Sequence, residues 1–121
     1  MKTSRKQLNT GRRTKREEKP PAVDYYKEYL LPTLKDLDRA AGYLTAALEE
    51  GEDVFLLAVR NVVDAHGGMR QLAKATRLNR ENLYDMLSDR GNPRLSSLAM
   101  ILDSLGLEIQ FRKKSGATGT A

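Results

Sequence analysis

The side chains with the most specific chemistry stand close together in the run RENLYD, residues 80–85. An arginine can donate two hydrogen bonds to one guanine, a glutamate can accept from cytosine, and an asparagine can pair with adenine. A tyrosine can meet a thymine methyl group or a phosphate. The set predicts contacts to the base edges of DNA, and its members are Arg80, Glu81, Asn82, Tyr84 and Asp85.

These side chains require a helix that turns them outwards. Asn79 is a favourable N-cap residue, and Leu83, Met86 and Leu87 recur at helical spacing on the opposite side. A short helix is therefore predicted from Asn79 to about residue 88, before a Gly-Asn-Pro breaker at residues 91–93.

A second short helix is predicted immediately before this one, over residues 69–76, with a tight corner at residues 77–79 in which Leu78 can enter the core. Two short helices joined by such a turn form the helix-turn-helix pattern, whose second helix can enter a major groove. Arginines at the ends of both helices are suited to holding phosphates, and these are Arg70, Arg77, Arg90 and Arg94.

The same residues have an alternative interpretation. Any small helical bundle has short helices with polar outer sides, and the carboxylates of Glu81, Asp85 and Asp89 would face phosphates unfavourably. From the pattern alone, a DNA-binding surface and an ordinary solvated surface are both open.

The remaining periodicity predicts an all-α fold with one exception. Further helices are expected over residues 24–31, ending before Pro32, and over residues 36–50, 52–65 and 95–105. Residues 107–112, LEIQFR, alternate apolar and polar side chains as a β-strand does. A lone strand cannot satisfy its own hydrogen bonds, so we expect a dimer with three side chains at or near the contact: Leu107, Ile109 and Phe111.

Composition narrows the possible classes of protein. The chain has 121 residues, enough for one modest domain, and it contains no cysteine and a single histidine, His66. We therefore expect no disulfide, no metal site and no cofactor. No nucleophile and base are paired in the sequence, so an enzyme is not expected. A cytoplasmic protein is expected, because no secretory signal or apolar run long enough to span a membrane is present.

Charge is unevenly distributed along the chain. Residues 1–20 contain eight Lys or Arg and two Glu, whereas residues 24–64 contain nine acidic and four basic residues. We expect a disordered basic arm over residues 1–22, a domain over residues 23–112 and a flexible tail over residues 113–121. The helix-turn-helix core of that domain spans residues 69–106 and its strand residues 107–112.

The run MRQLAKATRLNRENLYDMLSDRGNPRLSSLAMILDSLGLEI, residues 69–109, resembles the lambda-repressor-like (Xre-type) helix-turn-helix domain. Together with YLTAALEEG upstream, it is similar more narrowly to the addiction-module antidote proteins, the HigA-like antitoxins of type II toxin-antitoxin systems. The most specific part is LYDMLS followed by GNP and LGL. The resemblance implies a bundle of about five helices that dimerises on double-stranded operator DNA, represses its own operon and neutralises a small basic RelE/HigB-like toxin that cleaves mRNA.

Site residues follow from the resemblance position by position. It implies base contacts for Arg80, Glu81 and Asp85, and contacts to the DNA backbone for Arg70, Ser88, Asn92 and Arg94. The chain departs from the family pattern in two places. Met69 stands where many repressors have a glutamine that braces the first base-contacting residue, and Arg77 replaces a turn glycine, which requires a left-handed arginine or a different turn.

A basic toxin would be attracted to acidic side chains, which gives the acidic half of the chain a possible role. The candidates for toxin binding are Asp36, Asp38, Glu49, Glu50, Glu52 and Asp53. The alternative is that these carboxylates only complement helix dipoles and keep the domain soluble. Two other functions remain open: a phage- or plasmid-type helix-turn-helix transcription regulator without a toxin partner, and a small interaction protein.

Overall fold

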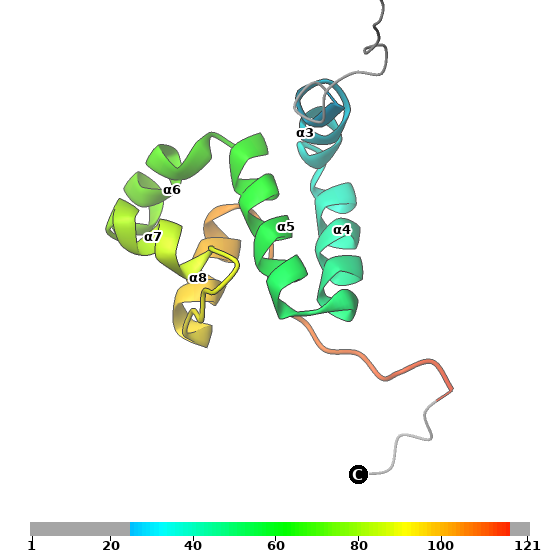
Figure 1. Ribbon diagram of the computed structural model, residues 1–121. Helices are drawn as coiled ribbons and strands as arrows, with labels where there is room; N and C mark the ends of the chain where they lie inside the picture. The colour runs from blue at the N-terminus through cyan, green and yellow to red at the C-terminus, as the bar shows by residue number, and fades with distance from the viewer. Residues whose placement is uncertain (1–24, 117–121) are drawn as a thin grey trace, which may run out of the picture. The chain divides into compact units, whose positions relative to one another are not determined.

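The computed structural model describes residues 25–116, and every regular element in that range is helical (Figure 1). The described residues belong to two compact units that meet between Pro32 and Thr33. The predicted basic arm, residues 1–22, and the end of the tail, residues 117–121, lie outside the described residues.

A helical segment begins in the first unit and ends at Leu34, just inside the second. A π-helical turn, η1 (Tyr26–Leu30), leads directly into α3 (Leu31–Leu34), and the rings of Tyr25 and Tyr29 lie 5.4 Å apart. The prediction that the helix ends before Pro32 was wrong, because Pro32 lies within α3. A proline is tolerated in the first turn of a helix, where its missing N–H is not needed, and the π-helical turn before it breaks the regular α-helical register.

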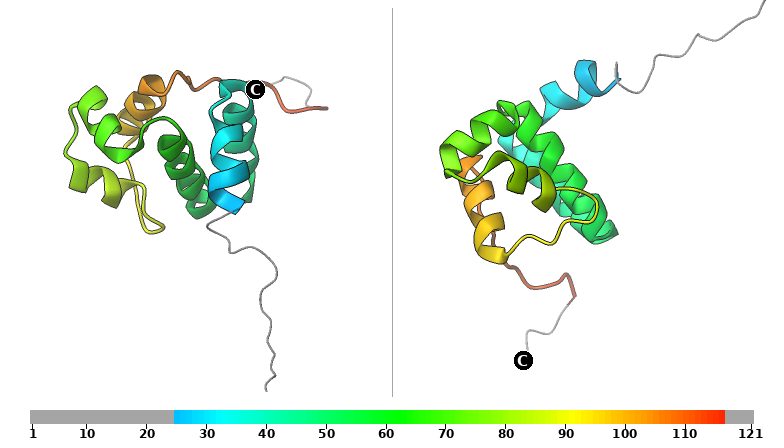
Figure 2. Two further views of the ribbon diagram at one scale, coloured as in Figure 1. Left: turned by 90° about the horizontal axis from the view of Figure 1, so that it is seen from above. Right: turned by 60° about the vertical axis from the view of Figure 1, so that its left-hand side comes forward.

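Two helices of equal length form the first layer of the second unit. They are α4 (Leu37–Glu50) and α5 (Glu52–Ala65), packed side by side and joined at Gly51 (Figures 1 and 2). The carboxylate of Asp36 caps α4 by accepting from the backbone N–H groups of Asp38 at 2.9 Å and Arg39 at 3.3 Å. Such a cap satisfies donors that the first turn of a helix leaves free, which explains why α4 begins here.

Only some of the apolar side chains of α4 are buried. Ala40, Leu44 and Ala47 are buried, whereas Leu37 and Leu48 are 38% and 58% exposed. Helix α5 is the most buried element, with Val59 and Val62 fully enclosed. At its end the ring Nε2 of His66 lies 2.9 Å from the carbonyl oxygen of Leu34, and both residues belong to the second unit.

Three shorter helices complete the unit, and they are α6 (Gly68–Thr76), α7 (Arg80–Met86) and α8 (Leu95–Ser104). Helix α6 is central, since it contacts α5, α7 and α8. Met69, Leu72, Leu83 and Ile101 bring these helices together in one core. Among residues 25–116, no helix is both long enough and apolar enough to cross a membrane.

The predicted C-terminal β-strand is absent from the part of the chain that the structure describes. After α8, Leu107 donates its backbone N–H to the carbonyl oxygen of Leu102 at 2.8 Å. The chain then continues as an extended segment without regular secondary structure (Figure 1). A strand is defined by hydrogen bonds to a neighbour, and within residues 25–116 no second segment lies beside this one to provide them.

Candidate nucleic-acid interface

The start of α7 is held by one side chain. The Oδ1 atom of Asn79 accepts from the backbone N–H of Glu81 at 2.8 Å and from that of Asn82 at 3.2 Å, which confirms the predicted N-cap. Leu83 and Leu87 are fully buried on the inner side. The five predicted base-contacting side chains are therefore turned to solvent: Arg80, Glu81, Asn82, Tyr84 and Asp85.

The sequence left two possibilities for the corner between α6 and α7, a left-handed Arg77 or a different turn, and the structure has the first. This arginine is left-handed, with φ 62° and ψ 20°, and its N–H donates to the carbonyl oxygen of Ala73 at 2.8 Å. The hydroxyl of Thr76 donates to the carbonyl oxygen of Leu72 and accepts from the N–H of Leu78. The turn thus keeps the usual geometry of a glycine while presenting an exposed arginine side chain.

Met69, at the position of the bracing glutamine in the family pattern, belongs to the buried side of α6. Its side chain is buried, with 6% of its surface exposed. A thioether is at most a weak acceptor and cannot donate a hydrogen bond. Met69 therefore packs in the core and cannot donate the bracing hydrogen bond that a glutamine could.

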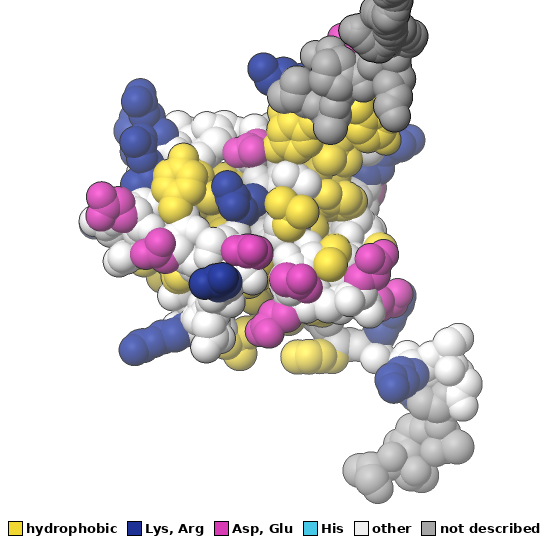
Figure 3. Space-filling model, in the orientation of Figure 1, with side chains coloured by type: hydrophobic (Ala, Val, Ile, Leu, Met, Phe, Trp, Pro, Cys, Tyr) yellow, Lys and Arg dark blue, Asp and Glu magenta, His cyan; other side chains and the backbone are white. Residues whose placement is uncertain are grey.

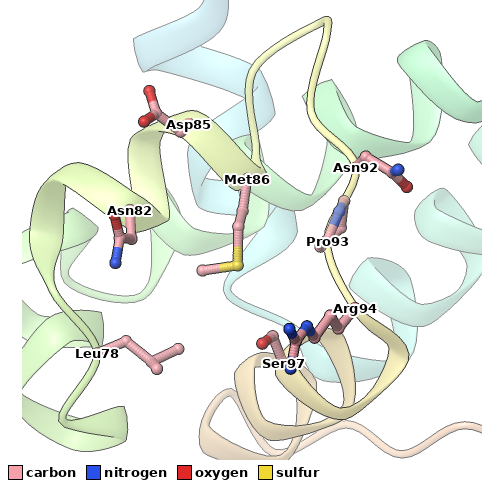
Figure 4. A pocket seen from close by; sticks show the side chains of 8 residues that line it. All are labelled: Leu78, Asn82, Asp85, Met86, Asn92, Pro93, Arg94 and Ser97. Carbon is pink, nitrogen blue, oxygen red and sulfur yellow. The ribbon is translucent and has the colours of Figure 1, made fainter.

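One cavity brings together residues that the sequence places in separate elements. It has a volume of about 400 Å³ and lies between the corner after α6, helix α7, the loop after α7 and the start of α8. Its lining consists of Leu78, Asn82, Asp85, Met86, Asn92, Pro93, Arg94 and Ser97. In Figure 4, Met86 points into the middle of the cavity, Asp85 points away from it at the rim, and Arg94 lies beside Ser97.

This cavity brings together four of the eleven residues predicted to contact DNA. Asn82 and Asp85 come from the base-contacting set, and Asn92 and Arg94 come from the backbone-contacting set. Ser97 was not singled out from the sequence, and its position in the first turn of α8 was the only available signal. Arg80, Glu81 and Tyr84 do not line the cavity, and they lie on the exposed surface of α7.

The loop after α7 folds back tightly onto the end of that helix. A Cβ atom on Gly91 would collide with the carbonyl oxygen of Met86 and would lie 2.6 Å from its carbonyl carbon. The N–H of Gly91 donates to the carbonyl oxygen of Ser88 at 2.9 Å. The hydroxyl of Ser88 itself donates to the carbonyl oxygen of Asp85, so a bond from Ser88 to a phosphate requires its hydroxyl to rotate.

Within residues 25–116, the charged side chains of α7 and of the loop after it form no salt bridge. A salt bridge between Arg39 and Asp36, at 3.9 Å, lies far along the chain from this surface. The predicted phosphate-binding arginines are all exposed, and they are Arg70, Arg77, Arg90 and Arg94. Figure 3 shows acidic side chains across the face formed by α7 and α5, with separate basic side chains between them and at its edges.

The six acidic candidates for toxin binding divide into two groups. Asp36 and Asp38 lie at the start of α4, whereas Glu49, Glu50, Glu52 and Asp53 surround the corner where α4 meets α5. A helix of this length separates its two ends by about 20 Å. Asp53 also lines a cavity of about 220 Å³ together with Val54, Leu57, Arg60, Leu87 and Asp89.

Metal binding has no support in the described residues, where no group of three or more His, Asp or Glu side chains converges. The described part of the chain thus presents a small helical domain whose most distinctive surface is the exposed side of α7 with the cavity beside it.

Comparison with known proteins places this domain in a family. Residues 27–113 match the family described as "Probable addiction module antidote protein", and the chain belongs to this family. The chain is also similar to an uncharacterized protein of Haemophilus influenzae, with 28% identity over 71 residues that cover 59% of this chain and 73% of the relative. No solved structure matches the chain.

Proposed function

We propose that the protein is the antitoxin of a type II toxin-antitoxin module. In this proposal a dimer binds operator DNA through α7 and represses the operon, and the same protein neutralises a RelE/HigB-like toxin that cleaves mRNA. Membership of the antidote family supports a toxin partner in general. The operator, the dimer and the class of toxin are parts of the proposal.

The main support for DNA binding is the way in which α7 is held against the core of the domain. Its N-terminus is fixed by Asn79 and its inner side by Leu83 and Leu87, so its polar side chains project from a rigid base. A helix that contacts base edges must be positioned in this way, because a loose helix would lose its discrimination between bases. Arg80 is in the first turn, where side chains of a recognition helix reach the bases.

Affinity for DNA would come from the surrounding cations. Arg70 and Arg77 lie at the two ends of α6, and Arg90 and Arg94 lie in the loop between α7 and α8. Phosphate contacts of this kind set register and affinity without carrying sequence information. The carboxylates of Glu81 and Asp85 weaken non-specific attraction to phosphates, which favours sequences whose bases compensate for them.

The part of the proposal that concerns the toxin rests on the corner between α4 and α5. Four exposed carboxylates surround this corner, and the cavity beside Asp53 has an apolar floor that includes Leu57, which is 55% exposed. The methylene stem of a lysine or arginine can pack on such a floor while its charge meets a carboxylate. A basic toxin would be attracted to this surface, and the attraction would weaken as the salt concentration rises.

Two experiments test the proposal. The first is a gel-shift titration of the purified protein against the promoter region of its own operon, with an unrelated duplex of equal length as the control. A specific complex at physiological salt is expected, and equal affinity for both duplexes would remove the DNA-binding part.

The second experiment is co-expression with the product of the adjacent gene, followed by a pull-down. We expect a stable complex with a basic protein of about 100 residues and rescue of cell growth from its toxicity. Specific operator binding without such a partner would instead establish the alternative function, a helix-turn-helix transcription regulator of phage or plasmid type.

A further inference from the structure

An apolar cavity lies along the extended segment that follows α8, residues 107–111. It has a volume of about 350 Å³, and its walls come from α4, the start of α5, α8 and the segment itself. The side chains that matter most here are Leu48, Leu95, Leu107, Ile109 and Phe111. Leu95 is 72% exposed and Phe111 is 95% exposed, so this surface lacks a cover within the described residues.

The backbone of the segment also lacks partners. Among residues 25–116, the backbone groups of residues 108–111 make no hydrogen bond to one another or to another segment. A row of free N–H and C=O groups beside an apolar cavity is a template for pairing with another extended chain.

The segment runs along α4 in the same direction as that helix. A Cβ atom on Gly106 would lie 3.0 Å from Cδ1 of Leu37 at the start of α4, while Phe111 and Leu48 line the same cavity near its end. Eleven residues of α-helix and five residues of extended chain each span about 16 Å, so the two elements match in length. Consequently, the start of the segment lies beside Asp36 and Asp38, and its end lies towards Glu49 and Glu50.

We infer that the occupant of this surface is the same segment of a second copy, paired antiparallel about a two-fold axis at Ile109. This inference rests on the dimer in the proposed function and gives it a register. Pairing about residue 109 places Leu107 opposite Phe111 of the second copy, so all three apolar side chains are covered together. It also places Glu108 opposite Gln110 of the second copy, and these two side chains already form a hydrogen bond within one chain at 2.7 Å.

Charge selects the antiparallel direction. The segment continues into Arg112, Lys113 and Lys114, all of which are exposed. Parallel pairing would place the two basic triplets side by side, which is unfavourable. Antiparallel pairing carries each triplet past Gly106 of the other copy, towards the start of α4, where Asp38 is exposed and has no ion-pair partner among the described residues.

With this register, the six acidic candidates for toxin binding fall into two groups, one facing the second copy and one open to a toxin. Asp36 and Asp38 face the basic triplet of the second copy, and the corner with Glu49, Glu50, Glu52 and Asp53 stays open for a toxin. The ion pairs of the dimer and the proposed toxin contact therefore lie at opposite ends of α4.

Cysteine cross-linking tests the register directly, because the chain has no cysteine of its own. In an antiparallel pair centred on residue 109, Ile109→Cys lies about 5 Å from its counterpart, within reach of a disulfide, whereas Leu107→Cys lies about 13 Å from its counterpart. We expect a covalent dimer for Ile109→Cys under mild oxidation. We also expect a heterodimer when Leu107→Cys is mixed with Phe111→Cys, and at least a several-fold lower yield from either variant alone.

A charge reversal tests the direction independently of cysteine chemistry. Asp38→Lys should raise the dissociation constant of the dimer by about three- to tenfold, because two symmetric ion pairs are lost. Asp38→Lys combined with Lys113→Glu should restore most of the affinity. Glu49→Lys at the other end of α4 is the matched control, and it should leave the dimer unchanged.

The outcomes are separable from those of the proposed function. A monomer by light scattering at micromolar concentration, or a dimer weakened by Glu49→Lys and not by Asp38→Lys, would overturn the inference. The inference would also be overturned if this segment became covered only when a toxin binds, because the toxin would then be its occupant. Specific operator binding by a dimer that does not cross-link at Ile109→Cys would overturn the register and leave the proposed function standing.

Discussion

Gly91 packs against the carbonyl group of Met86 so closely that a Cβ atom at this position has no space. The obstacle is backbone, which cannot move aside as the end of a flexible side chain can. This contact holds the loop after α7 against the end of that helix and thereby brings Asn92 and Arg94 to the cavity that Asn82 lines.

We therefore expect Gly91→Ala to displace the loop. The free energy of unfolding should fall by about 1–3 kcal/mol, as for other overpacked sites, and operator affinity should fall with it. Thermal denaturation and a gel shift measure the two effects. Gly42→Ala is the matched control, since a Cβ there meets nothing within 4 Å and the residue lies within α4; it should stabilise the protein by about 0.5–1 kcal/mol.

Removing the cap of α7 should loosen the helix that carries the site. Asn79→Ala leaves the N–H groups of Glu81 and Asn82 without their acceptor, and the free energy of unfolding should drop by about 1 kcal/mol. Asn79→Asp and Asn79→Ser keep an acceptor and should restore most of the stability. Urea denaturation of the three variants decides this, and equal stability of the alanine and serine variants would contradict the role of the cap.

Arg77 offers a test in which stability and binding change in opposite directions. Because its φ is 62°, Arg77→Gly relieves backbone strain and should raise the free energy of unfolding by up to about 1 kcal/mol. The same change removes a cation and should weaken operator binding at low salt. Arg77→Lys keeps both the strain and the charge, so we expect it to match the parent protein in both measurements.

Two arginines should separate specificity from general affinity. Arg80→Ala should cost about 1–3 kcal/mol of binding free energy at the operator and relax the preference for one base pair. Arg94→Ala should weaken binding to all sequences and reduce the slope of log affinity against log salt by about 0.9. Titrations at several salt concentrations, each with operator and unrelated DNA, distinguish the two. Identical behaviour of both variants would contradict the assignment of Arg80 to base contacts.

Local signals explain why most of the helices could be predicted. The Asn79 and Asp36 caps act within a few residues of the chain. Helical periodicity likewise identified Leu83 and Leu87 as the buried side of α7, and the structure confirms it. These local interactions fix the helix ends and the buried side of α7, and the packing of the rest of the fold does not change them.

Long-range contacts explain what the sequence left open. The sequence gives no sign that the loop would fold back at Gly91, and so Ser97 and the shared cavity were not foreseen. The exposure of Leu37 and Leu48 depends on which elements pack against α4, and periodicity alone cannot determine this. The strand was predicted from alternation, but a strand needs a partner whose identity the alternation does not specify.

The sequence by itself determined most of the helices, the Asn79 cap and the outward direction of the polar side chains of α7, because each depends on residues within one or two turns. Only the tertiary structure decided which of those side chains share a cavity and which apolar side chains of α4 stay exposed. These are relations between elements distant in sequence, and they are set by packing around the α5–α6 core and by the close contact of Gly91 with Met86.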